Sequence, residues 1–182
     1  MKANLIGNKN IFAIGYAFLE DGDTEITMFI EGKNILEFTN GGILRTTRWN
    51  LDELTMWLRE FVDNLQEDPY PVEVEGRYAA DKDDNARDFD SEDEEEFDAY
   101  YDKLWDWCHM HKWHSASSGA ILADLYFQLV SDKVEISWDN RSDEAEFTYL
   151  RGGTSIDKNL FVDVINKFLN AYADHWFNNK AQ

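Results

Sequence analysis

The chain has 182 residues, with 17 Lys and Arg against 37 Asp and Glu, which gives a formal net charge of −20 and a pI near 4.3. Hydrophobic residues make up 43% and aromatic residues 15% of the chain, so it has the core-forming material that a disordered acidic chain lacks. The charge argues against the phosphate backbone of nucleic acid and against anionic membrane surfaces as direct partners.

The cysteine content and the N-terminal residues predict a cytoplasmic protein. Cys108 is the single cysteine, which rules out an intramolecular disulfide and suits a reducing compartment. The first ten residues contain too short an apolar stretch for a secretory signal. No segment approaches the roughly 18 consecutive apolar residues that a membrane span needs.

The first third of the chain predicts a strand meander followed by a helix. Short β-prone runs, separated by turn residues, predict strands at Ile11–Leu19, Thr24–Ile30, Lys33–Thr39 and Ile43–Thr47. Asn40-Gly41-Gly42 is typical of a turn, and Asn50 is expected to cap the helix. Helical spacing is shown by the apolar residues Leu51, Leu54, Trp57, Leu58, Phe61 and Leu65.

The last third repeats this plan. It predicts strands at Leu125–Val130, Lys133–Trp138 and Ala145–Leu150, a turn at Arg151-Gly152-Gly153, and a helix capped by Asp157 or Ser155. The apolar positions of that helix are Val162, Ile165, Phe168, Leu169, Tyr172 and Trp176. Matching positions in the two thirds are offset by 109 to 111 residues, which favours a structural repeat over coincidence.

We therefore predict an α+β fold. Two similar antiparallel β-meander-plus-helix units, residues 1–70 and 119–182, are joined by an acidic segment and a central helix, residues 71–118, within one compact domain. Pro71 to Glu75 is predicted as a short edge strand. The central helix is expected to begin at Glu94-Glu95-Glu96, because acidic residues favour a helix N-terminus. Its predicted apolar face consists of Phe97, Tyr100, Tyr101, Leu104, Trp105 and Cys108.

The most unusual feature is an acidic run from Asp81 to Asp98. It holds eleven Asp or Glu against Lys82 and Arg87, a local net charge of −9. One interpretation is a solvated linker that keeps the protein soluble. The other is a recognition surface that attracts a basic partner, with interleaved aromatic residues as anchors. The predicted partner-binding residues are Asp88, Phe89, Asp90, Glu92, Asp93, Glu94, Glu95, Glu96, Asp98 and Tyr100.

A second cluster has the residue types of a metal site. Cys108, His111 and His114 step by three along the expected helix, and sulfur and imidazole nitrogen are the donors that zinc or copper prefers. The alternative is a core-facing cysteine with histidines at a helix end. Residues 81–92 also match an EF-hand-like register, although Ala86 replaces the usual central glycine.

Catalytic signatures are missing. Ser115, Ser117 and Ser118 lie near His114, but no Gly-x-Ser-x-Gly elbow and no phosphate-binding loop is present, so we expect no cofactor and assign no catalytic residue. Carboxylates are too numerous for any pair to be selected as acid and base.

These observations lead to a functional hypothesis. The chain is interpreted as an acidic inhibitor of the immunity, antitoxin or counter-defence type, which neutralises a basic and nucleic-acid-handling protein by charge and shape mimicry. The first alternative is a metal-binding module or metal-dependent enzyme that uses the cluster from Cys108 to His114. The second is an adaptor that binds a peptide along the edge strand at Pro71 to Glu75.

Overall fold

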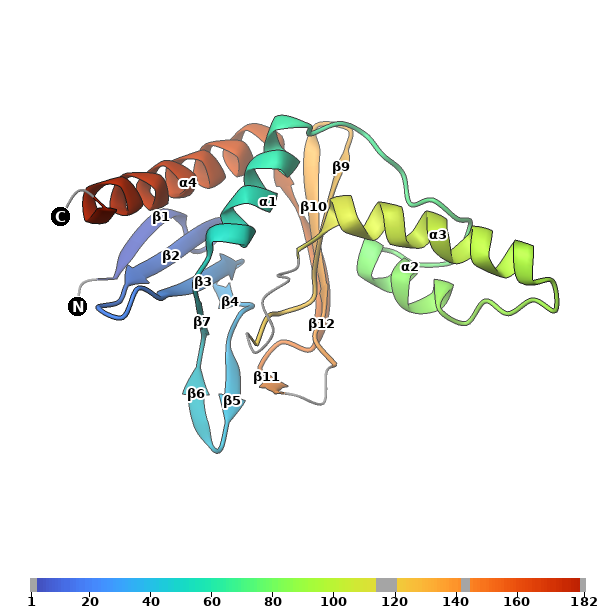
Figure 1. The fold of residues 1–182 in the computed structure, drawn as a ribbon, viewed down its shortest axis with the longest axis horizontal. Coiled ribbons are helices and arrows are strands. Elements are labelled where there is room, and N and C mark those ends of the chain that lie inside the picture. Colours follow the sequence, from blue (N-terminus) through green and yellow to red (C-terminus); the bar gives the residue numbers. More distant parts are fainter. Residues whose placement is uncertain (1–2, 114–120, 142–144, 181–182) are drawn as a thin grey trace.

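The computed structural model describes residues 3–113, 121–141 and 145–180, and it confirms an α+β fold with antiparallel sheets (Figure 1). The first sheet has the strand order β1-β2-β3-β4, and β7 also pairs with β3. Its strands are β1 (Asn4–Asn8), β2 (Phe12–Phe18), β3 (Thr24–Ile30), β4 (Lys33–Asn34) and β7 (Thr47–Trp49). Alternation of polar and apolar residues places β3 as predicted, whereas the exposed edge strand β1 was missed.

A small hairpin from the first third of the chain pairs with a strand from the last third. It is formed by β5 (Phe38–Asn40) and β6 (Ile43–Arg45), and β11 (Glu146–Phe147) pairs with β5. Gly41 and Gly42 both have positive φ, at 58° and 76°, which is the conformation that a tight hairpin turn requires. The predicted turn at Asn40-Gly41-Gly42 is confirmed.

The second sheet has the order β12-β10-β9-β8. Its strands are β8 (Lys112–Trp113), β9 (Leu125–Val130), β10 (Lys133–Asp139) and β12 (Arg151–Asp157). The predicted turn at Gly152-Gly153 is wrong, because both glycines lie inside β12. A Cβ atom at Gly152 would lie 2.6 Å from the Trp138 ring, and one at Gly153 would lie 2.6 Å from the Tyr78 ring. Glycine fits at both positions because any side chain would overlap an aromatic ring.

Helices α1 (Asp52–Asp63) and α4 (Lys158–Lys180) are exchanged between the two sheets. Helix α4, from the end of the chain, covers the first sheet: Phe168 contacts Tyr16 with ring centroids 5.6 Å apart. Helix α1, from the first third, meets the second sheet through Phe61 and Phe127, 5.8 Å apart. One hydrophobic core therefore runs through both halves of the chain. Asp157 accepts a hydrogen bond from the Leu160 amide and caps α4 as predicted.

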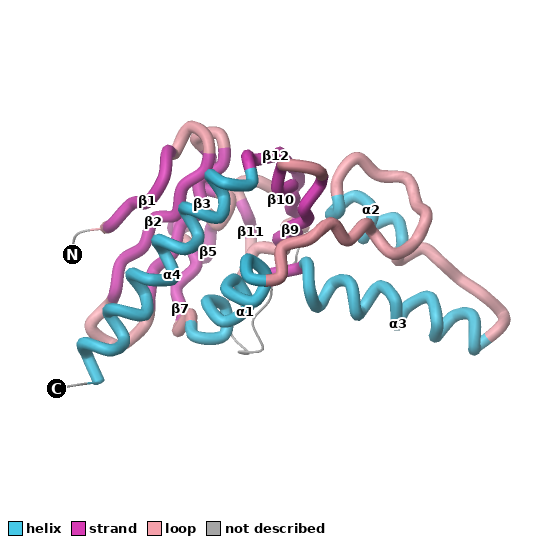
Figure 2. The backbone as a smooth tube through the Cα atoms, turned by 90° about the horizontal axis from the view of Figure 1, so that it is seen from above, coloured by secondary structure: helices cyan, strands magenta, loops and turns pink. Residues whose placement is uncertain are grey.

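Helices α2 (Ala79–Ala86) and α3 (Glu94–His111) form an arm beside the second sheet (Figures 1 and 2). Helix α2 is docked by its N-terminus: the Ala79 amide donates to Glu135 Oε1 at 2.7 Å and the Ala80 amide to Ser137 Oγ at 3.1 Å. These acceptors satisfy two of the amides that the start of a helix leaves unpaired. A second, smaller core joins the arm to β9.

Two expectations for the middle of the chain are wrong. The segment Pro71–Glu75 is not a strand, which removes the predicted edge for peptide binding. On α3, the structure buries Leu104, Trp107 and His111 and leaves Trp105 75% exposed. The predicted apolar face is right for Tyr100, Tyr101, Leu104 and Cys108, which lie in or against the small core of the arm, and wrong for the exposed Trp105 and Phe97. No helix in the described part of the chain is long and apolar enough to cross a bilayer.

The contact between Gly153 and Tyr78 gives a test of how the arm is docked. Gly153→Ala should lower the free energy of unfolding by about 1–3 kcal/mol, because the new methyl group displaces the ring that precedes α2. Chemical denaturation measures this change. Ser155→Ala, at an exposed position on the same strand, is the control and should have almost no effect; equal stability of the two variants would contradict the role of the glycine.

Candidate partner-binding surface

The acidic run divides into two parts with different roles. The first part lies on α2, where each of its carboxylates is paired with arginine. Asp81 lies 2.8 Å from Arg151, and Asp84 bridges Arg141 and Arg151 at 2.8 and 3.0 Å. These ion pairs connect α2 to the second sheet. Because residues 79–86 are helical, the EF-hand-like register does not form a calcium loop.

The second part, Asp88–Asp98, is called the acidic tip below. It comprises the loop after α2 and the first turns of α3, and it lies at the end of the arm that points away from the first sheet (Figure 1). All of its carboxylates are exposed to solvent, namely Asp88, Asp90, Glu92, Asp93, Glu94, Glu95, Glu96 and Asp98. The acidic tip contains no Lys or Arg, so its formal charge is −8.

Local hydrogen bonds give the acidic tip a defined shape. Asp93 is the N-cap of α3 and accepts hydrogen bonds from the amides of Glu95 and Glu96, at 3.0 and 3.3 Å. The Ser91 hydroxyl donates to Glu96 Oε2 at 2.7 Å. The helix was predicted to begin at Glu94, and it does so. A capped helix start holds the surrounding carboxylates in place better than a solvated linker would.

The aromatic residues that were predicted as anchors connect the loop of the acidic tip to α3. Phe89 stacks on Tyr100 with ring centroids 3.9 Å apart, and both side chains are half-buried. The Tyr101 hydroxyl lies 3.0 and 3.1 Å from the carbonyl oxygens of Arg87 and Phe89. The structure thus brings the predicted partner-binding residues together at one end of the arm. Their role in binding a partner stays a prediction.

At the base of the arm lies a buried carboxylate that the sequence did not single out. Asp83 is 4% exposed and accepts hydrogen bonds from the Tyr126 hydroxyl at 2.7 Å, from Arg87 at 2.8 Å and from the Cys108 thiol at 3.3 Å. Burial alone would raise the pKa of Asp83, but the hydrogen bonds from Arg87 and Tyr126 and the charge of Arg87 lower it below its usual value. Asp83 is therefore an ionised carboxylate at neutral pH.

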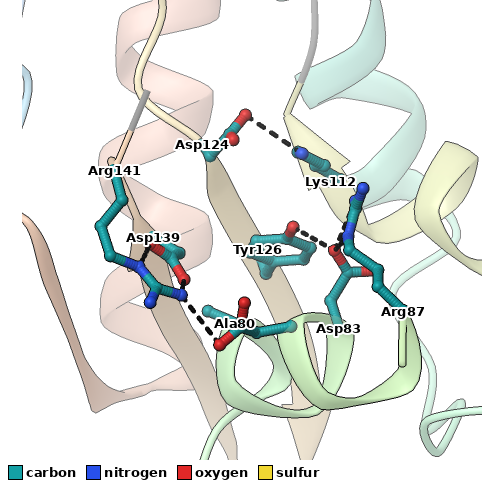
Figure 3. A pocket seen from close by; sticks show the side chains of 9 residues that line it. Ala80, Asp83, Arg87, Lys112, Asp124, Tyr126, Asp139 and Arg141 are labelled. Atoms are coloured by element: carbon teal, nitrogen blue, oxygen red, sulfur yellow. Dashed lines mark hydrogen bonds and ion pairs between the residues drawn. The ribbon is translucent and has the colours of Figure 1, made fainter. Parts of the chain in front are cut away.

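Asp83 borders a polar cavity of about 440 Å³ between α2 and the second sheet (Figure 3). Figure 3 shows Tyr126 between two charged groups, Asp83 with Arg87 on one side and Asp139 with Arg141 on the other. Lys112 pairs with Asp124 at 3.1 Å. Since the charged residues that line this cavity are all paired with one another, the arrangement serves to hold α2 against the second sheet, and we assign no catalytic role to it.

The predicted metal ligands Cys108 and His111 are hydrogen-bonded to different groups. The two ring nitrogens of His111 lie 2.8 Å from the Phe127 carbonyl and 3.0 Å from Asp68 Oδ2, while the Cys108 thiol faces Asp83. His114 lies outside the described residues. Within the described part, no group of three His, Cys, Asp or Glu side chains is placed to hold a metal ion. The contacts of Cys108 and His111 therefore give no support to the predicted metal site, which stays a prediction.

Comparisons with known proteins identify a similar fold. No protein-family model and no curated protein sequence matches the chain. Among solved structures, the fold resembles the crystal structure of CdiI from Burkholderia dolosa AUO158, with a TM-score of 0.50 and 16% sequence identity. The match covers 92% of this chain and 99% of the CdiI chain.

The lowered pKa of Asp83 predicts how stability depends on pH. A carboxylate whose pKa is lower in the folded state stabilises the fold above its unfolded pKa, and this contribution is lost as the pH falls through the folded value. Asp83→Asn should therefore cost about 2 kcal/mol or more at pH 7, and the cost should shrink below about pH 4. Denaturation at both pH values measures it. A pH-independent difference, or an equal cost for the exposed Asp98→Asn, would contradict this account.

The environment of Cys108 predicts a poorly reactive thiol. Burial, with the charge and hydrogen bonding of Asp83, raises the pKa of Cys108 to about 12. Because the thiolate is the nucleophile, alkylation by iodoacetamide at about pH 8 should be more than about tenfold slower in the folded protein than in denaturant. Asp83→Asn should accelerate labelling of the folded protein. Equal rates in the folded and unfolded states would show that the thiol is not shielded.

Proposed function

We propose that this protein is an immunity-type inhibitor that binds and neutralises a basic protein in the cytoplasm. The observation that carries the proposal is the acidic tip, whose eight exposed carboxylates lie on the loop after α2 and on the capped start of α3, at the end of the arm. Such a surface attracts a cationic cleft over a distance and raises the rate of association. We further propose that the cleft is one that binds nucleic acid, because carboxylates compete there with phosphate oxygens for the same Lys and Arg side chains.

The likeness to CdiI supports the class of function. CdiI is a contact-dependent inhibition immunity protein, and proteins of that kind bind a toxin partner. At 16% identity the likeness concerns the fold. The extension to a toxin-neutralising role is our proposal, and it agrees with the charged surface and with the lack of a catalytic signature in the sequence.

The contrast between the two parts of the acidic run supports a recognition role for the tip. On α2, the carboxylates of Asp81 and Asp84 are paired with arginine and stabilise the fold. At the tip, carboxylates crowd one another without a basic residue among them, which is unfavourable in the free protein. A basic partner supplies the missing counter-charges. We propose that binding relieves this repulsion.

Charge reversal tests the proposal once a partner has been isolated from the native host or from a competitor of it. The bait is the full chain at low salt, and a candidate is accepted only if it slows growth when expressed alone and if co-expression of this protein restores growth. A variant that combines Asp88→Lys, Asp90→Lys, Glu92→Lys and Asp98→Lys should lower the association rate constant by about tenfold or more. Stopped-flow or surface-plasmon-resonance kinetics measure that rate constant.

The design separates charge at the tip from total charge and from folding. The variant spares Asp93 and Glu96, whose carboxylates hold the start of α3. The control reverses four exposed acidic residues on other faces, Glu20, Glu60, Asp63 and Asp132, and has the same net charge. Its association rate should fall much less. An unchanged association rate constant for the tip variant, or an equal decrease for the control, would contradict the mimicry mechanism.

A further inference from the structure

Helix α3 exposes a tryptophan next to the acidic tip. Trp105 is 75% exposed and is the most exposed large hydrophobic residue in the described part of the chain. Its neighbour Trp107 is buried in the small core of the arm, and Trp105 is not part of that core. Trp is one of the residue types enriched among the side chains that dominate binding energy at protein interfaces.

Trp105 forms one wall of a recess between α3 and α2. The recess has a volume of about 480 Å³, and its apolar surface comes from α3, where Tyr101, Leu104 and Cys108 accompany Trp105. Asp83 and Arg87 of α2 form the opposite side. This recess differs from the cavity in Figure 3, although Asp83, Arg87 and Lys112 border both. It is a place where a long side chain finds both apolar contact and charge.

Ion pairing around the recess leaves one carboxylate without a basic partner among the described residues. Arg87 is paired with Asp83 at 2.8 Å, and Lys112 is paired with Asp124 at 3.1 Å. Asp102, an exposed lining residue, has no basic partner among the residues that the structure describes. On the helix, Asp102 precedes Trp105 by three residues and so lies on the neighbouring part of the surface. One carboxylate is thus left beside one exposed indole.

We infer that this recess receives an arginine side chain of the basic partner. The inference rests on the proposed function, because it names the group through which the acidic protein engages its partner. A guanidinium stacks on the indole face by cation–π attraction, while its N–H groups donate to Asp102. The aliphatic part of the arginine covers the apolar wall. Lysine makes a weaker contact, because its compact and strongly hydrated ammonium does not stack.

Peptide probes test the recess without the partner. Fluorescence anisotropy at low salt gives the affinities of labelled hexa-arginine and hexa-lysine peptides for the full chain. The wild-type protein should prefer hexa-arginine, and Trp105→Ala should weaken hexa-arginine binding by about fivefold while changing hexa-lysine binding by less than about twofold. Trp105→Phe should retain part of the preference. The four-residue charge reversal at the acidic tip should weaken both peptides by similar factors.

The control is Met56→Ala, which removes an apolar side chain that is 71% exposed on α1, outside the recess, and should leave both affinities unchanged. Because Trp105 is so exposed, its variants should keep the thermal unfolding midpoint of the wild type. Equal effects of Trp105→Ala on the two peptides, or no effect on either, would overturn the arginine assignment. The growth assay reports on the inhibitor function separately, so failure of one proposal is distinguishable from failure of the other.

Discussion

The arm depends on the burial of one carboxylate. Removing the charge of Asp83 from water is costly, and the cost is offset because an arginine, a tyrosine hydroxyl and a thiol all donate to it. Arg87 comes from the end of α2, Tyr126 from β9 and Cys108 from α3. Asp83 thereby connects both helices of the arm to the second sheet. Loss of any one of these donors leaves a buried charge less well compensated, so the three elements are fixed together.

A fixed arm matters for the binding that we propose. If residues 79–111 were a flexible chain, each carboxylate at the tip would lose conformational freedom when a partner bound, and that loss would weaken the complex. The docking of Ala79 and Ala80 on Glu135 and Ser137, together with the cap at Asp93, removes much of this cost before binding. The same rigidity holds Trp105 beside Asp102 on one helical surface.

The sequence predicted the elements whose local pattern agrees with their environment. Thr24–Ile30 and Leu125–Val130 have the predicted bounds, because a strand with one or two buried faces shows its period directly. Helix α2 was missed, since Ala79–Ala86 has no large apolar residue on its buried side, which consists of three alanines and Asp83, and since Asp81 pairs with the distant Arg151. Trp105 and Trp107 are both compatible with a helical stripe, and only the position of β9 decides which is buried. Gly152 and Gly153 resemble a turn until the aromatic rings that they admit are known.

The same reasoning explains why the exposure of the acidic tip could be predicted but its geometry could not. Its composition shows that it must be solvated, and the cluster from Glu94 to Glu96 indicates a helix start. Nothing local shows that Phe89 stacks back on Tyr100 or that α2 anchors the preceding residues. Like charges one helical turn apart, such as Glu94, Asp98 and Asp102, destabilise an isolated helix. A chain that needed charge only for solubility would gain stability by spreading these residues over its surface. Their concentration on one capped helix, at the end of a docked arm, is what a protein requires when the charge itself is the contact.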